Sequence, residues 1–420
     1  MRKDDAVSDS PGQPASPFAV RGRVVTPTGV VDDGVVVVDG GLIAWVGPAR
    51  DVPARWAEAV RASGSAAGLV LPGLVDLHNH GGGGGSFPDA TTATEAATAI
   101  AEHRRHGTTS LVASLVTAPR DELLARTALL AGLAGAGELA GIHLEGPFLS
   151  HARCGAQNPD DMLAGDPALV RDVAAAARGH LVTMTVAPEV PGVVAEAPGA
   201  DDVLAALVSA GAVPSIGHTD ASAEQVDAAV ARGFDLLATD GGARSGRLTA
   251  THLFNGMRPL HHRDPGPIAA CLAAAARGEL VVELVADGTH LADGTVRSVF
   301  DLVGADAIAL VTDAMAAAGM PDGEYQLGPK AVTVAGGVAR LSGPDGAIAG
   351  GVAHLVDVVR QVVAAGIPLA DAVRAASTTP AAVLGRHDVG ALVAGRRADV
   401  LVTDGDLRPV AVYRGGARVA

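Results

Sequence analysis

Histidines and carboxylates stand at the ends of apolar runs in this sequence. His78 and His80 close the run "LVLPGLVDL", Glu145 ends "AGIHLE", and Asp313 follows "AIALVT". Imidazole nitrogens and carboxylate oxygens are ligands for divalent metal ions. Because side chains alternate along a strand, His78 and His80 should point to the same side and grip one ion. The competing interpretation is a polar pair at a solvated edge.

A second set of candidate ligands combines Glu145 with His218 in "SIGHTDAS" and His252 in "THLFNGM". An unpaired carboxylate is costly to bury in an apolar strand, and a cation removes that cost. Two imidazoles and one carboxylate leave coordination positions open for water, as a catalytic ion requires. The alternative for Glu145 is a capping or salt-bridging role. His143, two residues before it, is expected to be a packed, hydrogen-bonded histidine.

Asp313 is the candidate general acid and base. A metal ion lowers the pKa of water, and a nearby carboxylate can take the proton and return it to a leaving group. The alternative is a helix N-cap, because "TDAMAAAG" also suits the start of a helix.

The elements that must position these side chains alternate between apolar, strand-like runs and Ala-rich, helix-like runs. Helices are expected at 91–105, 119–134, 201–210, 222–232 and 293–303. Eight strand-like runs are expected at 69–78, 108–116, 140–146, 181–189, 213–219, 248–255, 279–288 and 307–315. This alternation predicts an α/β fold with a (β/α)8 TIM barrel, whose active groups lie at the C-terminal ends of its strands.

The two ends of the chain differ from the middle. Short alternating runs punctuated by Gly and Asp predict antiparallel strands at 17–67 and 388–420, which together form one small β-sandwich domain. Residues 68–387 form the barrel. Residues 1–16 are polar, contain Pro and Ser, and are expected to be a disordered tail.

Composition narrows the class of protein. The 420 residues are 48% hydrophobic and carry a net charge of −15, which argues against nucleic-acid and anionic-membrane partners. The two cysteines, Cys154 and Cys271, are too few for a disulfide framework. The sequence shows no secretory signal pattern and no uninterrupted apolar run of about 18 residues, so a cytoplasmic location is expected.

The motifs carry a resemblance. "PGLVDLHNHG", "HLEGPFLS", "GHTDAS", "THLFNGM", "ADGTHL" and "LVTDAM" resemble, in content and order, those of N-acetylglucosamine-6-phosphate deacetylases, which are metal-dependent amidohydrolases. The resemblance implies a TIM barrel with a small β-sandwich and hydrolysis of N-acetylglucosamine 6-phosphate to glucosamine 6-phosphate and acetate. It implies that Glu145, His218 and His252 hold the main ion, with Asp313 as general acid/base.

The same resemblance implies one or two divalent ions per subunit, Zn first, with Fe, Mn or Co as alternatives. His78 and His80 would hold a second ion bridged by Glu145. The positions implied to bind substrate are Gln157, Asn255, Gly256, Arg263 and His290. The arginine is similar to one that reaches into the neighbouring subunit's site, which implies a homodimer; the alternative for Arg263 is a surface ion pair.

The sequence also departs from the family pattern. Gln157, in "HARCGAQNPD", stands where many relatives have a histidine, so the exact amino sugar stays open, as does the role of Cys154 in this loop. Residues 239–248 look like an insertion between His218 and His252. A carboxylated lysine, typical of hydantoinases, is excluded because the only lysines are Lys3 and Lys330. Another N-acylated amino sugar or related amide, or a non-catalytic sugar-phosphate sensor, is the alternative function.

Overall fold

The computed structural model describes residues 16–64, 68–195, 200–240, 242–343 and 346–420. The tail expected at 1–16 lies outside these residues, except for Ser16. Within the described ranges, every helix is too short or too polar to cross a bilayer.

The central element is an eight-stranded sheet in the order β14-β13-β12-β11-β10-β9-β8-β5, and every neighbouring pair in it is parallel. A parallel bridge between Asn79 and Ala314 joins the chain beyond β5 to the chain beyond β14. The predicted barrel is therefore confirmed. Its strands are β5 (Leu74–Asp76), β8 (Thr108–Leu115), β9 (Gly141–Glu145), β10 (Leu181–Val186), β11 (Val213–Ile216), β12 (Leu248–Ala250), β13 (Leu280–Leu284) and β14 (Ile308–Leu310).

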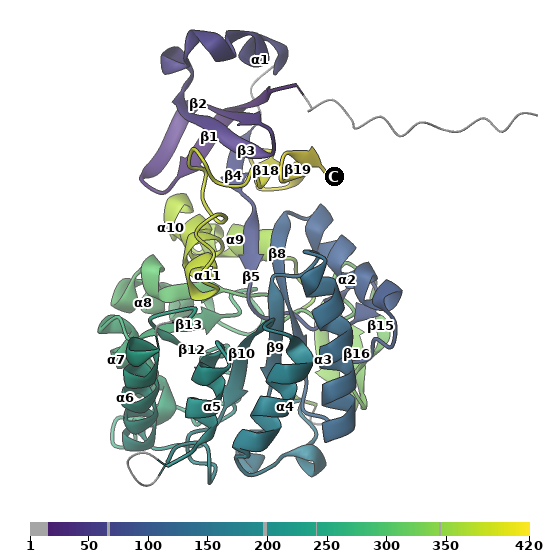
Figure 1. Ribbon diagram of the computed structural model, residues 1–420, viewed down its shortest axis with the longest axis vertical. Coiled ribbons are helices and arrows are strands. Elements are labelled where there is room, and N and C mark those ends of the chain that lie inside the picture. Colours follow the sequence, from purple (N-terminus) through teal and green to yellow (C-terminus); the bar gives the residue numbers. More distant parts are fainter. Residues whose placement is uncertain (1–15, 65–67, 196–199, 241, 344–345) are drawn as a thin grey trace, which may run out of the picture.

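Helices surround the barrel (Figure 1). Thr92 and Ser222 form capping boxes that start two of them, because each side chain accepts the N–H of the third helical residue. Their apolar faces pack on the strands, and the five predicted helices are all present. The helices are α2 (Ala93–Arg105), α3 (Arg120–Gly135), α4 (Pro167–Ala177), α5 (Val203–Ser209), α6 (Ala223–Thr239), α7 (Gly266–Ala276), α8 (Asp293–Val303), α9 (Leu355–Ala364), α10 (Leu369–Ala375) and α11 (Thr378–Val383).

Both chain ends contribute to a separate seven-stranded sheet, which lies at the upper end of the molecule in Figure 1. One face packs against α1 (Ala57–Ala62) through Trp56, Ala59 and Val60. The small β domain expected from both ends is thus present. Its strands are β1 (Phe18–Thr26), β2 (Gly29–Asp39), β3 (Leu42–Pro48), β4 (Leu69–Pro72), β18 (Val400–Thr403), β19 (Pro409–Arg414) and β20 (Ala417–Arg418).

The strand expected at 69–78 is divided between the two sheets. Its first part, β4, pairs with β1 and β18, and its second part, β5, pairs with β8. Gly73 lies between them. A side chain does not fit at this position, because a Cβ would come within 2.2 Å of the Thr109 hydroxyl oxygen. The chain therefore passes directly from the small sheet into the first barrel strand, which carries His78 and His80 at its end.

Two further sheets were not predicted. A hairpin of β6 (Gly81–Gly82) and β7 (Gly85–Ser86) follows His80 and uses the glycine run to turn. Three antiparallel strands, β15 (Gly323–Leu327), β16 (Lys330–Ala335) and β17 (Val338–Leu341), stand between β14 and α9. Short 3-10 helices lie at Ala49–Asp51, Ala54–Trp56, His151–Arg153, Pro159–Asp161 and Ala305–Ala307.

The barrel strands end earlier than their apolar runs suggested. β5 ends at Asp76, β11 at Ile216, β12 at Ala250 and β14 at Leu310. Apart from Glu145, the candidate ligands lie beyond the last strand residue. His78 and His80 flank Asn79, which forms a parallel bridge with Ala314, so the chain remains paired for a short distance beyond β5.

Candidate metal centre and active site

Glu145 lies at the centre of the candidate site. Nε2 of His218 and Nε2 of His252 each lie 2.8 Å from Oε1 of Glu145. The two imidazole rings are nearly perpendicular, with centres 5.0 Å apart and an interplanar angle of 82°. Zn–N bonds of about 2.0 Å at tetrahedral angles put two ring centres about 5 Å apart. The predicted set of two histidines and one carboxylate therefore converges with a spacing that suits one ion.

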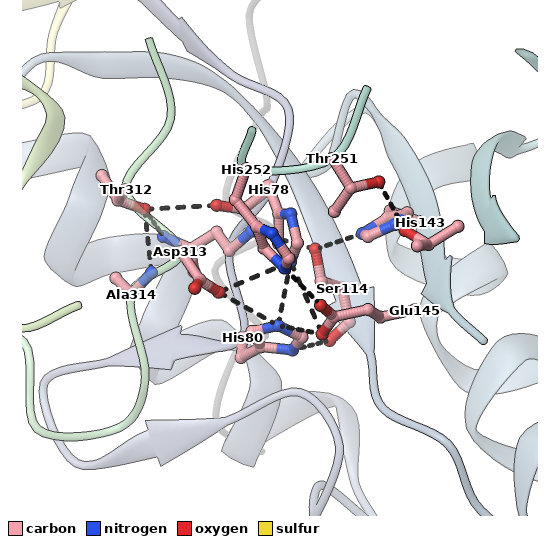
Figure 2. A network of polar contacts seen from close by, with 12 residues as sticks. His78, His80, Ser114, His143, Glu145, Thr251, His252, Thr312, Asp313 and Ala314 are labelled. Carbon is pink, nitrogen blue, oxygen red and sulfur yellow. Dashed lines mark hydrogen bonds and ion pairs between the residues drawn. The ribbon is translucent and has the colours of Figure 1, made fainter. Parts of the chain in front are cut away.

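His78, His80 and Asp313 form a second ligand group beside the first (Figure 2). The Nε2 atoms of the two histidines are 3.0 Å apart, and Oδ1 of Asp313 lies 3.5 Å and 3.4 Å from them. The other oxygen of Glu145, Oε2, lies 3.1 Å from Nε2 of His80. Glu145 thus directs one oxygen to each group, which is the geometry of a bridging carboxylate.

Backbone conformation turns several of these residues inward. His218, His252 and Asp313 have φ values of 47°, 27° and 48°, in the left-handed region that non-glycine residues rarely adopt. Such conformations persist only where the surrounding structure holds them, and they are concentrated at functional sites. Each of the three stands two or three residues after its strand. The left-handed turn therefore redirects the chain so that its side chain faces the barrel axis.

Two candidate ligands, His80 and His218, hydrogen-bond to backbone carbonyl oxygens through Nδ1, the ring nitrogen that points away from Glu145. Nδ1 of His80 lies 3.2 Å from the carbonyl of Ser114, and Nδ1 of His218 lies 2.7 Å from the carbonyl of Arg153. A carbonyl accepts only from N–H, so Nε2 of each ring is left bare toward the centre. His143 differs, because both of its nitrogens contact hydroxyls, those of Ser114 and Thr185. It is the packed, hydrogen-bonded histidine that the sequence indicated.

The electrostatics favour ionised carboxylates among basic imidazoles. Burial opposes ionisation of Glu145, but His218, His252 and His78 outweigh it and hold its pKa well below the ordinary value. Burial likewise opposes ionisation of Asp313, and His78 and His80 lower its pKa nonetheless. Without a cation, this negative charge must be balanced by protonated histidines. A divalent cation would supply the same balance and leave the imidazoles neutral.

A cavity of about 240 Å³ opens onto both ligand groups. His290 lines this cavity, and its Nδ1 lies 2.9 Å from Oδ2 of Asp287. Burial opposes protonation of His290, but the contact with Asp287 outweighs burial and raises the pKa of the imidazole. Asn255 and Gly256 also line it, and a Cβ at Gly256 would lie 2.7 Å from Nδ1 of His218. The structure therefore brings together ten of the eleven residues predicted for the site.

Gln157 lines the same cavity but is engaged by the protein itself. Its side-chain nitrogen donates to Oε2 of Glu145 at 2.6 Å, and its oxygen accepts the backbone N–H of Thr117 at 2.8 Å. The amide therefore holds the second oxygen of the central carboxylate. The sequence predicts Gln157 as a substrate-binding residue and gives no sign of its contact with Glu145.

A sequence model of the amidohydrolase family matches residues 69–419, which include every residue of the site. The chain belongs to the amidohydrolase family. It is 33% identical over 391 residues to the N-acetylglucosamine-6-phosphate deacetylase of Lysinibacillus sphaericus, covering 91% of this chain and 92% of the relative. It is 32% identical over 393 residues to an N-acetylgalactosamine-6-phosphate deacetylase of Escherichia coli O157:H7, covering 92% and 94%.

A solved structure extends the match. It is of an N-acetyl-D-glucosamine-6-phosphate deacetylase variant from Mycobacterium smegmatis, in complex with N-acetyl-D-glucosamine-6-phosphate. This amidohydrolase matches it with a TM-score of 0.84 and 40% identity over 97% of this chain and 100% of the other. The resemblance inferred from the six motifs is therefore confirmed.

Arg263 is the predicted site residue that lies apart in this amidohydrolase. It is exposed on the loop between β12 and α7, and its Nη1 lies 2.9 Å from Nε2 of His262. It is not among the residues that line the 240 Å³ cavity. Within one subunit the described residues therefore give the cavity no arginine from this loop.

The described residues of the segment 239–248 lie at the opposite end of the barrel from the site. Arg244 donates to the carbonyls of Gly179 and Gly211, which precede β10 and β11. Arg247 donates to the carbonyl of Asp306, which precedes β14. All three partners stand before strands, whereas the candidate ligands stand at the ends of strands or after them. The described residues of this segment therefore stand between His218 and His252 in sequence but lie at the other end of the barrel.

A third cluster of ligand-type residues, Glu102, His106 and His354, lies outside the site. The two imidazoles are stacked with centres 3.6 Å apart at 16°, closer than two ligands of one tetrahedral ion. Nε2 of His354 lies 2.9 Å from Glu102, and its Nδ1 lies 3.2 Å from Asp357. We interpret this cluster as a structural contact that holds the start of α9 against α2.

Proposed function

We propose that this amidohydrolase removes the N-acetyl group of N-acetylglucosamine 6-phosphate, giving glucosamine 6-phosphate and acetate. The observation that carries the proposal is the convergence of His218 and His252 on one oxygen of Glu145, with Asp313 beside them at the mouth of the barrel. Relatives named for this reaction match along nearly the whole chain. Hydrolysis adds water across the amide, breaks its C–N bond and leaves the amine protonated.

Two divalent cations per subunit are the proposed cofactors. Glu145, His218 and His252 hold one, and His78, His80 and Asp313 hold the other. The donor set fits, because four imidazole nitrogens surround a carboxylate whose oxygens face different groups. Zn suits this mixture of nitrogen and oxygen donors, with Fe, Mn and Co as alternatives. When bound, the cations polarise the acetyl carbonyl and make a water molecule acidic near neutral pH.

Asp313 is the proposed general acid and base. Its side chain is 13% exposed and lines the cavity, so it can contact both water and substrate. The side chain is an ionised carboxylate, so one of its oxygens can accept a proton from the attacking water. The same carboxyl group then delivers that proton to the departing amine, which must leave as a neutral group.

The cavity wall orients the sugar. Asn255, Gly256 and His290 face it, and the raised pKa of His290 favours an imidazolium that can donate to a carbonyl or phosphate oxygen. The phosphate requires a stronger cation. We assign that role to Arg263 of a second copy of the chain, because in its own subunit it stands apart from the cavity while its guanidinium matches a phosphate. The active form is therefore a homodimer.

A substrate panel tests the proposal. Acetate and free amine are quantified with N-acetylglucosamine 6-phosphate, N-acetylgalactosamine 6-phosphate and the unphosphorylated sugars, on protein of measured metal content. We expect equal amounts of acetate and amine, loss of activity on chelation, and the highest kcat/KM with N-acetylglucosamine 6-phosphate by at least about tenfold. Metal-loaded protein that releases no acetate from any of these sugars would contradict the proposal and support a sugar-phosphate sensor.

A second substrate is favoured by one comparison. The relative from Escherichia coli O157:H7 is named for N-acetylgalactosamine 6-phosphate and is as similar as the others, at 32% identity. Glucosamine and galactosamine differ only in the orientation of one hydroxyl, and discrimination between them depends on a hydrogen bond in the cavity wall. A higher kcat/KM with the galacto sugar would reassign the substrate while keeping the reaction.

A further inference from the structure

Glu283 is a buried carboxylate in the middle of an apolar strand. It lies in β13 between Val282 and Leu284 and is 2% exposed. Among the described residues, its ion-pair partner is the imidazole of His78, with Nδ1 3.3 Å from Oε2 of Glu283. No arginine or lysine of the described chain lies within 4 Å of it. Burying a carboxylate without a neighbouring positive charge costs free energy. The negative charge of Glu283 must therefore be balanced by positive charge at the site.

We propose that Glu283 is a positioning residue for the metal centre, a proposal that rests on the proposed function. Nδ1–H of His78 donates to Glu283, which leaves Nε2 of His78 bare. That Nε2 faces the second ligand group, 3.0 Å from Nε2 of His80 and 3.5 Å from Asp313. A carboxylate behind a metal-binding imidazole fixes the ring and increases its basicity. His80 and His218 have backbone carbonyls in the equivalent place.

The same carboxylate also contacts the first ligand group. Oε2 of Glu283 accepts the backbone N–H of His252 at 3.3 Å, and its backbone carbonyl accepts the N–H of Leu253 at 2.8 Å. His252 needs this support, because its φ of 27° is unfavourable for a residue with a side chain. The side chain of Glu283 therefore contacts one residue of each ligand group. It contacts the imidazole of His78 and the backbone N–H of His252.

The two contacts predict an asymmetric effect. Both contacts use Oε2 of Glu283, and the oxygen of a neutral amide could accept either N–H. The charge of Glu283 matters mainly for His78, because it increases the basicity of an imidazole that would bind the ion, whereas the N–H of His252 belongs to the backbone. Replacing Glu283 by glutamine keeps the shape and one acceptor oxygen but removes the charge. We therefore expect the His78–His80–Asp313 group to lose affinity while the Glu145–His218–His252 group keeps its ion.

The test compares Glu283→Gln with wild type and with Glu279→Gln. Glu279 precedes the same strand and pairs with Arg277, far from the ligands, so its variant is a matched control. Metal-depleted proteins are titrated with Zn²⁺ against a chelator, and bound Zn²⁺ is counted per subunit. We expect two ions in wild type and the control, and one of the two sites about 10- to 100-fold weaker in Glu283→Gln. Co²⁺-substituted proteins should show the same loss in visible absorption.

Stability separates positioning from a merely structural role. Metal-free Glu283→Gln lacks the charged partner of His78 and should melt at or below the temperature of metal-free wild type. It should also gain less in melting temperature than wild type on adding Zn²⁺, whereas a merely structural role would leave that gain unchanged. Two ions bound at wild-type affinity in Glu283→Gln would overturn the inference while leaving the proposed function intact. A wild-type protein that binds no ion would overturn both. If the glutamine variant does not fold, Glu283→Asp, which keeps the charge but withdraws the oxygen, is tested in the same titration and is expected to weaken the same site.

Discussion

The side-chain amide of Gln157 donates to Oε2 of Glu145 across 2.6 Å. Oε1 of Glu145 is already contacted by His218 and His252, so the amide holds the carboxylate plane that faces both ligand groups. Gln157 is fixed in turn by the N–H of Thr117. Gln157, which the sequence predicts to bind substrate, therefore also orients the central carboxylate.

Gln157→Ala is expected to weaken metal binding and lower kcat, because Glu145 loses a donor and gains freedom to rotate. The loss should be about 10- to 100-fold in metal affinity or activity, as for other residues that orient a metal ligand. Competition with a chelator and steady-state kinetics measure the two effects. Asn158→Ala is the control, because this neighbouring amide donates to Asp161 and not to Glu145. A rise in KM alone, with metal affinity unchanged, would return Gln157 to a purely substrate-binding role.

The barrel and most of the site follow from sequence because of the topology. In a parallel barrel all strand ends meet at one face, so polar residues after eight apolar runs must gather even though the chain separates them widely. Glu145, His218 and His252 came together for this reason. The strand ends themselves were misplaced, because apolar residues such as Val311 continue beyond the last residue of the strand, and the left-handed φ at Asp313 leaves no mark on hydrophobic periodicity.

Asp313→Asn should reduce kcat by about 10²- to 10⁴-fold, because an amide cannot accept or return the proton. KM should change little. At least one ion per subunit should remain, since Glu145, His218 and His252 are untouched. Asp322→Asn, an exposed carboxylate that accepts the N–H of Gly336, is the control. Activity within a few-fold of wild type in Asp313→Asn would reject its role as general acid and base.

Asp357 should make a pH-dependent contribution to stability. Burial raises its pKa, but the contacts with His354 outweigh burial and lower the pKa from 3.8 to about 2. A carboxyl group with a depressed folded-state pKa stabilises the fold above its unfolded pKa, and this contribution is lost as the pH falls from about 4 to about 2. With the side chain 29% exposed, we expect about 1–2 kcal/mol at neutral pH.

Urea unfolding with chelator present throughout, at several pH values from 3 to 6, compares wild type with Asp357→Asn. The difference in free energy of unfolding should be largest near pH 6 and shrink toward pH 3. Asp371→Asn, at the same third position of α10, should show a smaller difference across this range. A gap between wild type and Asp357→Asn that does not narrow at low pH would reject the assigned cause.

Other residues of the site could not be placed from sequence. Glu283 did carry a signal, a lone carboxylate inside "LVVELV", but its partner His78 is 205 residues away. Asp76 and Thr312 are similar, because they hydrogen-bond at 2.6 Å only once the first and last barrel strands meet. Such pairings depend on barrel closure, which no local pattern encodes. The separation of Arg263 from its own cavity likewise became visible only in three dimensions.

Arg263→Ala is expected to raise KM for the 6-phosphate sugar by about tenfold or more and to leave KM for the unphosphorylated sugar nearly unchanged, because the guanidinium contacts only the phosphate.

Mixing of subunits then shows in which subunit's site Arg263 acts. In dimers that pair Arg263→Ala with Asp313→Asn, the Arg263→Ala chain contributes an intact Asp313 and receives Arg263 from its partner. Random reassociation should therefore restore about a quarter of the wild-type sites. The control mixes Asp313→Asn with Glu145→Gln, which damages both sites of every mixed dimer and should restore nothing. Equal KM effects on the two sugars would reject a phosphate contact, and absence of restoration in the first mixture would place the action of Arg263 within its own subunit.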